Sequence, residues 1–278
     1  MKIIQFNKSR FVWAFSYKDF HFLHLIYILI LMNPEIIKEE KDYLVINKPA
    51  GLVVHSDGRT EEKTLCDFII EKYPEISGVG EPLKIENKDE EGNIVEKIIN
   101  RPGIVHRLDR NTSGVMLVAR TNEGFDFLKE LFKNRQVEKT YHCFIYGNLK
   151  EDKIIVDDPI GRSKKDFRQW MAGDNARGKL RTAETEFNVL QRSEDKTVTF
   201  IEAKPKTGRT HQIRVHLKHL NSPIVSDELY APNRGKLLGF ERMALHAYSL
   251  KFTDQNEQLQ DFVADYSEDF KKAVESFK

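Results

Sequence analysis

A short polar segment near the middle of the chain carries the residue types that bond chemistry requires. It runs from Ile104 to Gly114 and reads IVHRLDRNTSG, so that Asp109 has an arginine two residues before it and another directly after it. Adjacent positive charge favours the ionised carboxylate, which suits a nucleophile or a ligand of a cationic group. The apolar run at 115–119 predicts a buried strand beside this loop. The alternative is a surface turn in which Asp109 only pairs with its arginines, an interaction of little energetic value.

Four further segments form an ordered set with this one. They are INKPAGLVVH (Ile46–His55), KTYHCFIYG (Lys139–Gly147), KPKTGRTHQIRVHL (Lys204–Leu217) and ALHAYSLKF (Ala244–Phe252). Together the five segments resemble the signature of the RluA-type pseudouridine synthases, which isomerise uridine in RNA. The resemblance extends from about Tyr43 to about Phe252, and Asn111 stands where this family usually has an acidic residue.

The resemblance implies catalytic roles for three side chains. Asp109 is the expected nucleophile, Arg214 its salt-bridge partner, and Tyr141 the ring that stacks on the target base. A bidentate guanidinium keeps a carboxylate ionised and orients it, and a phenol offers a flat face with a polar tip. Taken singly, Arg214 and Tyr141 would be an ordinary helix arginine and a half-buried strand tyrosine. Attack on the base, attack on the sugar and formation of a glycal are all open to Asp109.

Basic and imidazole side chains near these segments are expected to contact RNA. Arg107 is expected to fill the space that the extruded uridine leaves, which offsets part of an extraction cost of about a few kcal/mol. His106 is expected to shape the catalytic loop and to border the RNA. The other expected RNA contacts are Lys204, Lys206, Arg209 and His211. Lysine and arginine contacts to phosphates predict an affinity that falls as salt rises.

No metal or cofactor is expected for this chemistry. The isomerisation breaks the C1′–N1 bond and rejoins the base through C5 without any redox change. The spacing of His211 and His216 does not place both on one helix face, and no HExxH pattern is present. Cys66 and Cys143 form no CxxC pair, so neither a zinc ribbon nor a disulfide framework is indicated. A reducing cytoplasm is the default location for such a chain.

The composition fits a soluble globular protein with ample core. The 278 residues are 40% hydrophobic and 31% charged, with a formal net charge of +1. The charge is unevenly placed: 204–218 contains no acidic residue and 162–181 is also basic, whereas acid collects at 81–96 and after Asp254. One basic face on a nearly neutral chain suits a protein that follows phosphates, although an ordinary mixed surface is the alternative.

The elements that position these residues indicate an α+β fold. We predict strands at 43–48, 115–119, 137–146, 182–191, 197–203 and 242–252, and helices at 64–73, 123–134, 210–220 and 267–277. Because few helices cross between strands, the sheet should be mostly antiparallel. The resemblance implies a pseudouridine synthase fold, in which a bent central sheet with flanking helices carries the active cleft. Residues 151–181 are predicted to be rich in loops.

Two segments lie outside the shared pattern. Residues 1–31 have no counterpart in the resemblance, and the apolar run at 22–32 is too short to span a bilayer comfortably. We expect a start codon assigned too far upstream of Met32 or, as the alternative, an interfacial anchor. Residues 81–100 are acidic and contain Gly92–Asn93, which predicts a β-hairpin inserted into one catalytic domain spanning 32–278. We expect a monomer, acting away from membranes on a stem-loop of ribosomal or transfer RNA.

Two other functions compete with pseudouridine synthesis. An RNA-binding protein that keeps the fold without activity has no chemical need for Asp109, Tyr141 and Arg214 together. A hydrolase of a glycosidic bond needs a second positioned acid, for which the sequence offers no recognisable candidate. The sequence therefore favours an isomerase.

Overall fold

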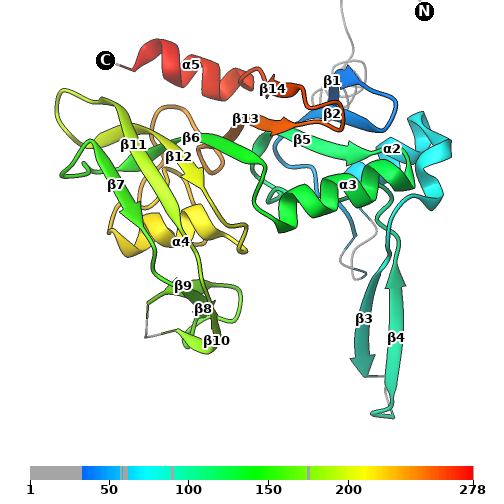
Figure 1. The fold of residues 1–278 in the computed structure, drawn as a ribbon. Helices are drawn as coiled ribbons and strands as arrows, with labels where there is room; N and C mark the ends of the chain where they lie inside the picture. Colours follow the sequence, from blue (N-terminus) through cyan, green and yellow to red (C-terminus); the bar gives the residue numbers. More distant parts are fainter. Residues whose placement is uncertain (1–32, 57, 59–61, 89–90, 174–175, 278) are drawn as a thin grey trace, which may run out of the picture. The chain divides into compact units, whose positions relative to one another are not determined.

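A sheet of nine strands organises the part of the chain that the computed structural model describes, which is residues 33–56, 58, 62–88, 91–173 and 176–277 (Figure 1). Contacts divide the chain at Asn33, and Pro34–Lys278 forms one compact unit. The apolar run at 22–32 lies outside the described residues, so its role stays a prediction. None of the described helices is both long and apolar enough to cross a membrane.

The sheet is mixed but mostly antiparallel. Its strand order is β1 (Glu35–Glu39), β2 (Tyr43–Lys48), β5 (Ser113–Ala119), β13 (Leu245–Thr253), β6 (Glu138–Tyr146), β12 (Val198–Pro205), β11 (Thr185–Arg192) and β7 (Lys153–Val156), and β14 (Leu259–Val263) pairs with β13. Only β5 and β13 run parallel among these described neighbours. The predicted α+β class and the mostly antiparallel sheet are confirmed.

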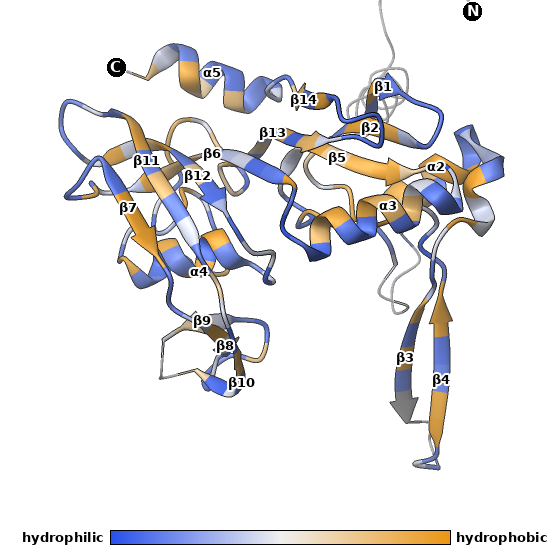
Figure 2. Cartoon of the chain, in the orientation of Figure 1, coloured by the Kyte–Doolittle hydropathy of each residue, from blue (hydrophilic) through white to orange (hydrophobic). Residues whose placement is uncertain are grey.

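Strand β5 is the centre of the packing on its side of the sheet. All seven of its residues are buried, and Figure 2 shows the strand as almost wholly hydrophobic. Gly114 lies opposite Ala247 of β13 and has φ +117. A Cβ atom at Gly114 would lie 2.1 Å from the Ala247 carbonyl oxygen. Only glycine therefore allows the two parallel strands to meet directly after the loop that carries Asp109.

The predicted helices are present with minor shifts at their ends. They are α2 (Leu65–Lys72), α3 (Asn122–Lys133), α4 (Gln212–His219) and α5 (Glu268–Ser276), and a short 3₁₀ helix (Pro74–Gly78) follows α2. Thr64 caps α2 in a reciprocal capping box with Asp67. Thr121 caps α3, and its hydroxyl accepts a hydrogen bond from the Gly124 amide. Local capping chemistry thus fixes where both helices begin.

Two large hydrophobic clusters and a smaller third one fill the unit. The first contains β2, β5, α2 and α3, and the second contains parts of β6, β11, β12, α4 and α5. Tyr141 packs against both clusters. A strand residue at this junction can project into a cleft bordered by both halves.

Short strands account for most differences from the predicted elements. Residues 151–181 contain β7 and a small three-stranded sheet, β8 (Ile160–Arg162), β9 (Trp170–Ala172) and β10 (Arg177–Arg181), where we predicted mainly loop. Strands β1 and β14 were also not predicted. The predicted hairpin is confirmed, since β3 (Leu83–Lys88) pairs with β4 (Ile94–Ile99).

Candidate active site

The loop that carries Asp109 is tied to the turn after β2 by a buried lysine. Lys48 Nζ donates to the carbonyl oxygens of Arg110 (3.1 Å), Pro49 (2.8 Å) and Leu52 (2.9 Å). The Gly51 amide also donates to the Arg110 carbonyl, at 2.8 Å. Burial, together with the positive charge of Arg242, lowers the pKa of Lys48 to about 7. Hydrogen bonds from the INKPAG segment therefore hold the loop of Asp109 in place.

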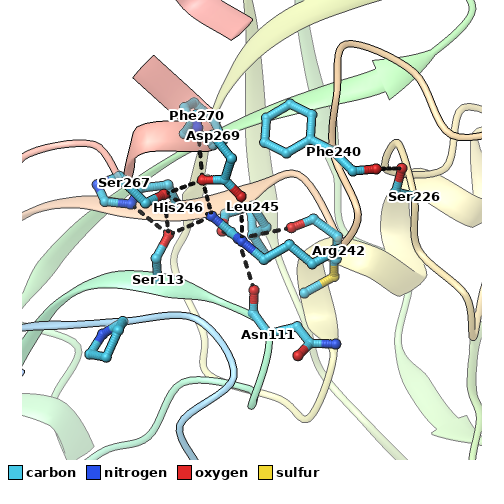
Figure 3. A network of polar contacts seen from close by, with 12 residues as sticks. Asn111, Ser113, Ser226, Phe240, Arg242, Leu245, His246, Ser267, Asp269 and Phe270 are labelled. Carbon is cyan, nitrogen blue, oxygen red and sulfur yellow. Dashed lines mark hydrogen bonds and ion pairs between the residues drawn. The ribbon is translucent and has the colours of Figure 1, made fainter. Parts of the chain in front are cut away.

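A second anchor holds the same loop from the side of α5 (Figure 3). Arg242 Nη1 donates to the Asn111 carbonyl oxygen at 2.9 Å, and Nη2 donates to Ser113 Oγ at 3.2 Å. Asp269 and Ser267 at the start of α5 accept three further hydrogen bonds from this guanidinium, at 2.8 to 3.0 Å. Because Arg242 binds main-chain oxygen, this anchor does not depend on the side chain that replaces the family's usual acid at Asn111.

Arg214 on α4 bridges two carboxylates. Its Nη1 donates to Asp109 Oδ2 at 2.8 Å, and its Nε and Nη2 donate to Asp227 Oδ2 and Oδ1 at 2.8 and 2.9 Å. The expected ion pair with Asp109 is therefore present. Burial opposes the charged guanidinium, but Asp227 and then Asp109 outweigh this and raise the pKa of Arg214.

The expected bidentate contact of Arg214 with Asp109 is wrong. Asp227 takes the bidentate face of the guanidinium, and only one nitrogen remains for Asp109. Asp227 is 1% exposed and also accepts from the amides of Leu229 and Tyr230, so it is held rigidly. We did not predict Asp227, because it follows α4 in a segment without a recognisable motif and meets Arg214 only in the fold.

Asp109, Tyr141 and Arg214 line one cavity of about 570 Å³. Tyr141 lies opposite Ala203 of β12 and Ala247 of β13, two small residues that leave room for its ring. Burial, and next the negative charge of Asp109, raises the pKa of the Tyr141 phenol. The phenol is therefore neutral at physiological pH and can stack or donate a hydrogen bond.

This geometry agrees with comparisons to known proteins. The model of the family RNA pseudouridylate synthase matches residues 42–219, more than half of the chain. The chain belongs to this family. Its members are isomerases, and the resemblance to the RluA type is confirmed by relatives named ribosomal large subunit pseudouridine synthase D.

The family relatives are similar over most of this chain. It is 33% identical over 248 residues to an uncharacterized RNA pseudouridine synthase of Bacillus subtilis, covering 89% of this chain and 74% of the relative. It is 36% identical over 228 residues to ribosomal large subunit pseudouridine synthase D of Yersinia pestis, covering 78% and 62%. Most of the curated relatives are longer, and the chain spans as little as 55% of their length.

Solved structures show the same fold. Human RNA pseudouridylate synthase domain containing 4 aligns with a TM-score of 0.64 at 23% identity, over 92% of this chain and 97% of that chain. Human RNA pseudouridylate synthase domain containing 1 aligns with a TM-score of 0.63 at 24% identity, over 85% and 84%. The pseudouridine synthase fold is thus shown for this chain.

The two predicted histidines, His106 and His211, line the cavity and make hydrogen bonds within the protein. His211 begins α4 with a left-handed φ of 55, and its Nδ1 lies 3.0 Å from the Tyr230 hydroxyl. Its Nε2 lies 3.8 Å from Asp109 Oδ2. His106 Nε2 accepts from the Leu117 amide at 2.9 Å, and burial lowers the pKa of this imidazole to about 3. His106 therefore shapes the loop as a neutral ring, and the RNA contacts of both histidines stay predictions.

The predicted cations separate into two groups. Arg107, Lys206 and Arg209 line the cavity, and Lys204 does not. Ala203 faces the cavity side with Tyr141, so the alternation along β12 turns Lys204 to the other face. There its Nζ pairs with Glu202 at 2.7 Å. Lys204, which we expected to contact RNA, therefore does not line this cavity.

A third histidine, His216, lies inside the fold. Its ring nitrogens lie 3.0 Å from Thr185 Oγ1 and 3.0 Å from the Asp158 carbonyl oxygen. Burial lowers the pKa of His216. Within the described ranges, no three His, Cys, Asp or Glu side chains are grouped to hold a metal ion.

Proposed function

We propose that this chain converts uridine to pseudouridine in structured RNA, with Asp109 as the nucleophile acting on a nucleotide flipped into the cavity. The observation that carries the proposal is the convergence of Asp109, Arg214 and Tyr141 on that cavity. In the reaction the C1′–N1 bond breaks, the base turns, C5 bonds to C1′, the hydrogen on C5 leaves as a proton, and N1 takes up a proton. The product has the same composition as the substrate, so the reaction needs no electron carrier.

The two oxygens of Asp109 are not equivalent. Oδ2 accepts the hydrogen bond from Arg214, whereas Oδ1 has no hydrogen-bond partner among the residues that the structure describes. A carboxylate fixed through one oxygen presents the other in a defined direction. We assign Oδ1 as the reacting oxygen. Attack at C1′, attack at C6 of the base and removal of the 2′ proton would all use this same atom.

Tyr141 supports the proposal through its ring and its neutral hydroxyl. A flipped pyrimidine needs a flat apolar surface to replace the stacking it loses in the RNA. Because burial and the charge of Asp109 raise the pKa of Tyr141, its phenol serves as a stacking surface and hydrogen-bond donor rather than as a base.

We propose large-subunit ribosomal RNA as the first substrate to test and transfer RNA as the second. Relatives from Yersinia pestis and Borreliella burgdorferi are named for the large ribosomal subunit. Cavity residues such as Arg107, Lys206 and Arg209 supply the positive charge that an RNA backbone requires. We further propose a monomer that acts in the cytoplasm without a cofactor.

Release of tritium from uridine labelled at C5 tests the activity directly, because the C5 hydrogen leaves only when C5 bonds to C1′. We expect wild-type protein to release tritium from an unmodified large-subunit ribosomal RNA transcript. Asp109→Asn should lower the rate by at least about a thousandfold while RNA affinity stays within about threefold. Activity retained in Asp109→Asn would contradict the assignment of the nucleophile.

Hydrolysis of the glycosidic bond is the competing outcome, and the geometry disfavours it. Asp227 is the second carboxylate at Arg214, but Arg214 and two main-chain amides occupy its oxygens. It is therefore not free to act as the second acid that a hydrolase needs. Mass spectrometry of the treated RNA separates the two reactions: an isomerase leaves the mass unchanged, and a hydrolase releases free uracil.

A further inference from the structure

One wall of the active-site cavity gathers three cations that have no acidic partner. Arg135, Lys139 and Lys206 all line the cavity, and none of them makes an ion pair within the described part of the chain. They come from three separate places. Arg135 lies two residues after α3, Lys139 is the second residue of β6, and Lys206 directly follows β12. Lys139 and Tyr141 are two residues apart on β6 and therefore share the cavity face.

Lys139 is the least solvated of the three. Its Nζ lies 3.5 Å from the Thr207 carbonyl oxygen, at the limit of a hydrogen bond, so most of the donor capacity of the ammonium is unused. Burial, and then the charges of Arg135 and Lys206, lowers the pKa of Lys139 to about 8. Like charges held close together destabilise one another, and a bound anion would relieve that repulsion.

Positive charge at this wall extends to its neighbours. Burial, followed by the charges of Arg181 and Arg135, lowers the pKa of Arg209. The fold thus accepts charge repulsion where the cavity meets these side chains.

Several lysines outside this trio pair with acids. Lys129 pairs with Glu81, Lys133 with Glu130 and Lys204 with Glu202, each at 2.7 Å. Lys204 and Lys206 are two residues apart in sequence, yet Lys204 is paired and does not line the cavity, whereas Lys206 lines the cavity and makes no ion pair within the described residues. The charge of Lys206 is therefore left available to a ligand in the cavity.

We propose that Arg135, Lys139 and Lys206 form a subsite that binds one backbone phosphate of the RNA beside the flipped uridine. The proposal deepens the proposed function and rests on it. A nucleotide whose base stacks on Tyr141 and whose sugar meets Asp109 carries a phosphate on each side of its ribose. A phosphodiester matches the donors present, since arginine offers a planar fork and each lysine a point charge. Asp109 does not neutralise these cations, because Arg214 already holds it.

The dependence of activity on salt tests the subsite with a matched control. Tritium release is measured as kcat/KM over about 50 to 300 mM KCl for wild type, Lys139→Met, Lys206→Met and Lys129→Met. Lys129 is the control, since it pairs with Glu81 and does not line the cavity. Each lost phosphate contact should flatten the slope of log kcat/KM against log salt by about 0.7 to 0.9. We expect this change for Lys139→Met and Lys206→Met, and the wild-type slope for Lys129→Met. If all three variants share one slope, the cations act only through the general field and the subsite is wrong.

A second probe is independent of how well the variants fold. Once the target uridine is mapped, a single neutral methylphosphonate replaces each flanking phosphate in turn. At one of the two positions the methylphosphonate should lower kcat/KM of the wild type by roughly tenfold or more. It should leave kcat/KM of Lys139→Met almost unchanged. If the loss from the methylphosphonate and the loss from Lys139→Met simply add at both positions, the subsite is wrong. A wild type that releases no tritium at any salt concentration would instead defeat the isomerase proposal, and the slope of RNA affinity would still test the phosphate contact.

Discussion

Arg214 has five N–H donors, and three of its nitrogens have defined partners. Nε and Nη2 bind Asp227, and Nη1 binds Asp109. The ring of Tyr230 lies 4.9 Å from the guanidinium carbon, so one face of the plane is also covered. Asp227 therefore fixes the plane of the guanidinium, and the fixed plane aims Nη1 at the catalytic carboxylate. At the scale of single residues, the buried partner matters as much as the group that reacts.

Asp227→Asn tests this positioning role. The amide keeps the shape of the side chain but removes the charge that holds Nε and Nη2. We expect kcat to fall by roughly ten- to a hundredfold, because a small shift of Arg214 misplaces Asp109, while KM for RNA stays within about threefold. Glu228→Gln is the control, since Glu228 is an exposed neighbour. Equal losses in kcat and in RNA affinity, or a variant that behaves like Glu228→Gln, would contradict the role.

Asp109, Arg214 and Tyr141 were predictable because each stands in a segment with a recognisable pattern. Their partners were not, because contacts between distant segments arise only from the fold. Asp227 meets Arg214 across a loop, and the alternation of β12 decides that Lys204 turns away from the cavity. The sequence indicates which side chains carry the chemistry, whereas strand register determines which of the surrounding charges reach it.

Among the elements, α5 is the one whose role in the site is least expected. It begins more than a hundred residues after the catalytic loop, yet Asp269 in its first turn holds Arg242, and Arg242 holds the Asn111 carbonyl oxygen (Figure 3). Burial alone would raise the pKa of Asp269, but Arg242 outweighs it and lowers that pKa. The pair therefore stabilises the folded state at neutral pH, and the contribution is lost as pH falls through the lowered pKa of Asp269.

Asp269→Asn should both destabilise the protein and slow the reaction. Loss of this partly buried charged partner costs about 1 to 3 kcal/mol, which corresponds to a decrease in Tm of about 3 to 8 °C for a unit of this size. Glu268→Gln removes a charge from the same turn of α5 without touching Arg242, so it controls for the helix dipole. The difference in Tm between wild type and Asp269→Asn should shrink as the pH falls below the ordinary pKa of an aspartate and through the lowered pKa of Asp269, where its carboxylate gains a proton. A decrease of the same size in Glu268→Gln would show that only the dipole is involved.

Long, buried elements were predictable and short, exposed ones were not. Strand β5 is apolar along its whole length, and α3 repeats its apolar residues at helical spacing. Strands β8 and β9 have three residues each, and β10 is exposed throughout, so neither a period nor a continuous apolar run marks them. Their pairing depends on neighbouring segments, which local sequence patterns do not reveal.

At the scale of the whole molecule, the site lies where two hydrophobic clusters meet. The loop of Asp109 enters from the first cluster, α4 with Arg214 belongs to the second, and Tyr141 packs against both. The strands β5, β13 and β6 join the two halves. The geometry of the candidate site is therefore a property of the folded unit as a whole, and loss of either cluster would separate Asp109, Arg214 and Tyr141.

Removal of residues 1–32 tests where that folded unit begins. Every residue of the two described clusters follows Pro34, with Ile36 the first to pack against them. Because burial of apolar surface supplies most of the stability, we expect the shortened protein to keep its Tm within about 2 °C and its rate of tritium release within about twofold. Removal of residues 1–48 is the control, since it deletes β2, where Leu44, Val45 and Ile46 are fully buried, and it should abolish cooperative unfolding. If the shorter deletion also lowers Tm by many degrees, the N-terminal segment belongs to the stable core, and the boundary of the catalytic domain lies upstream of Met32.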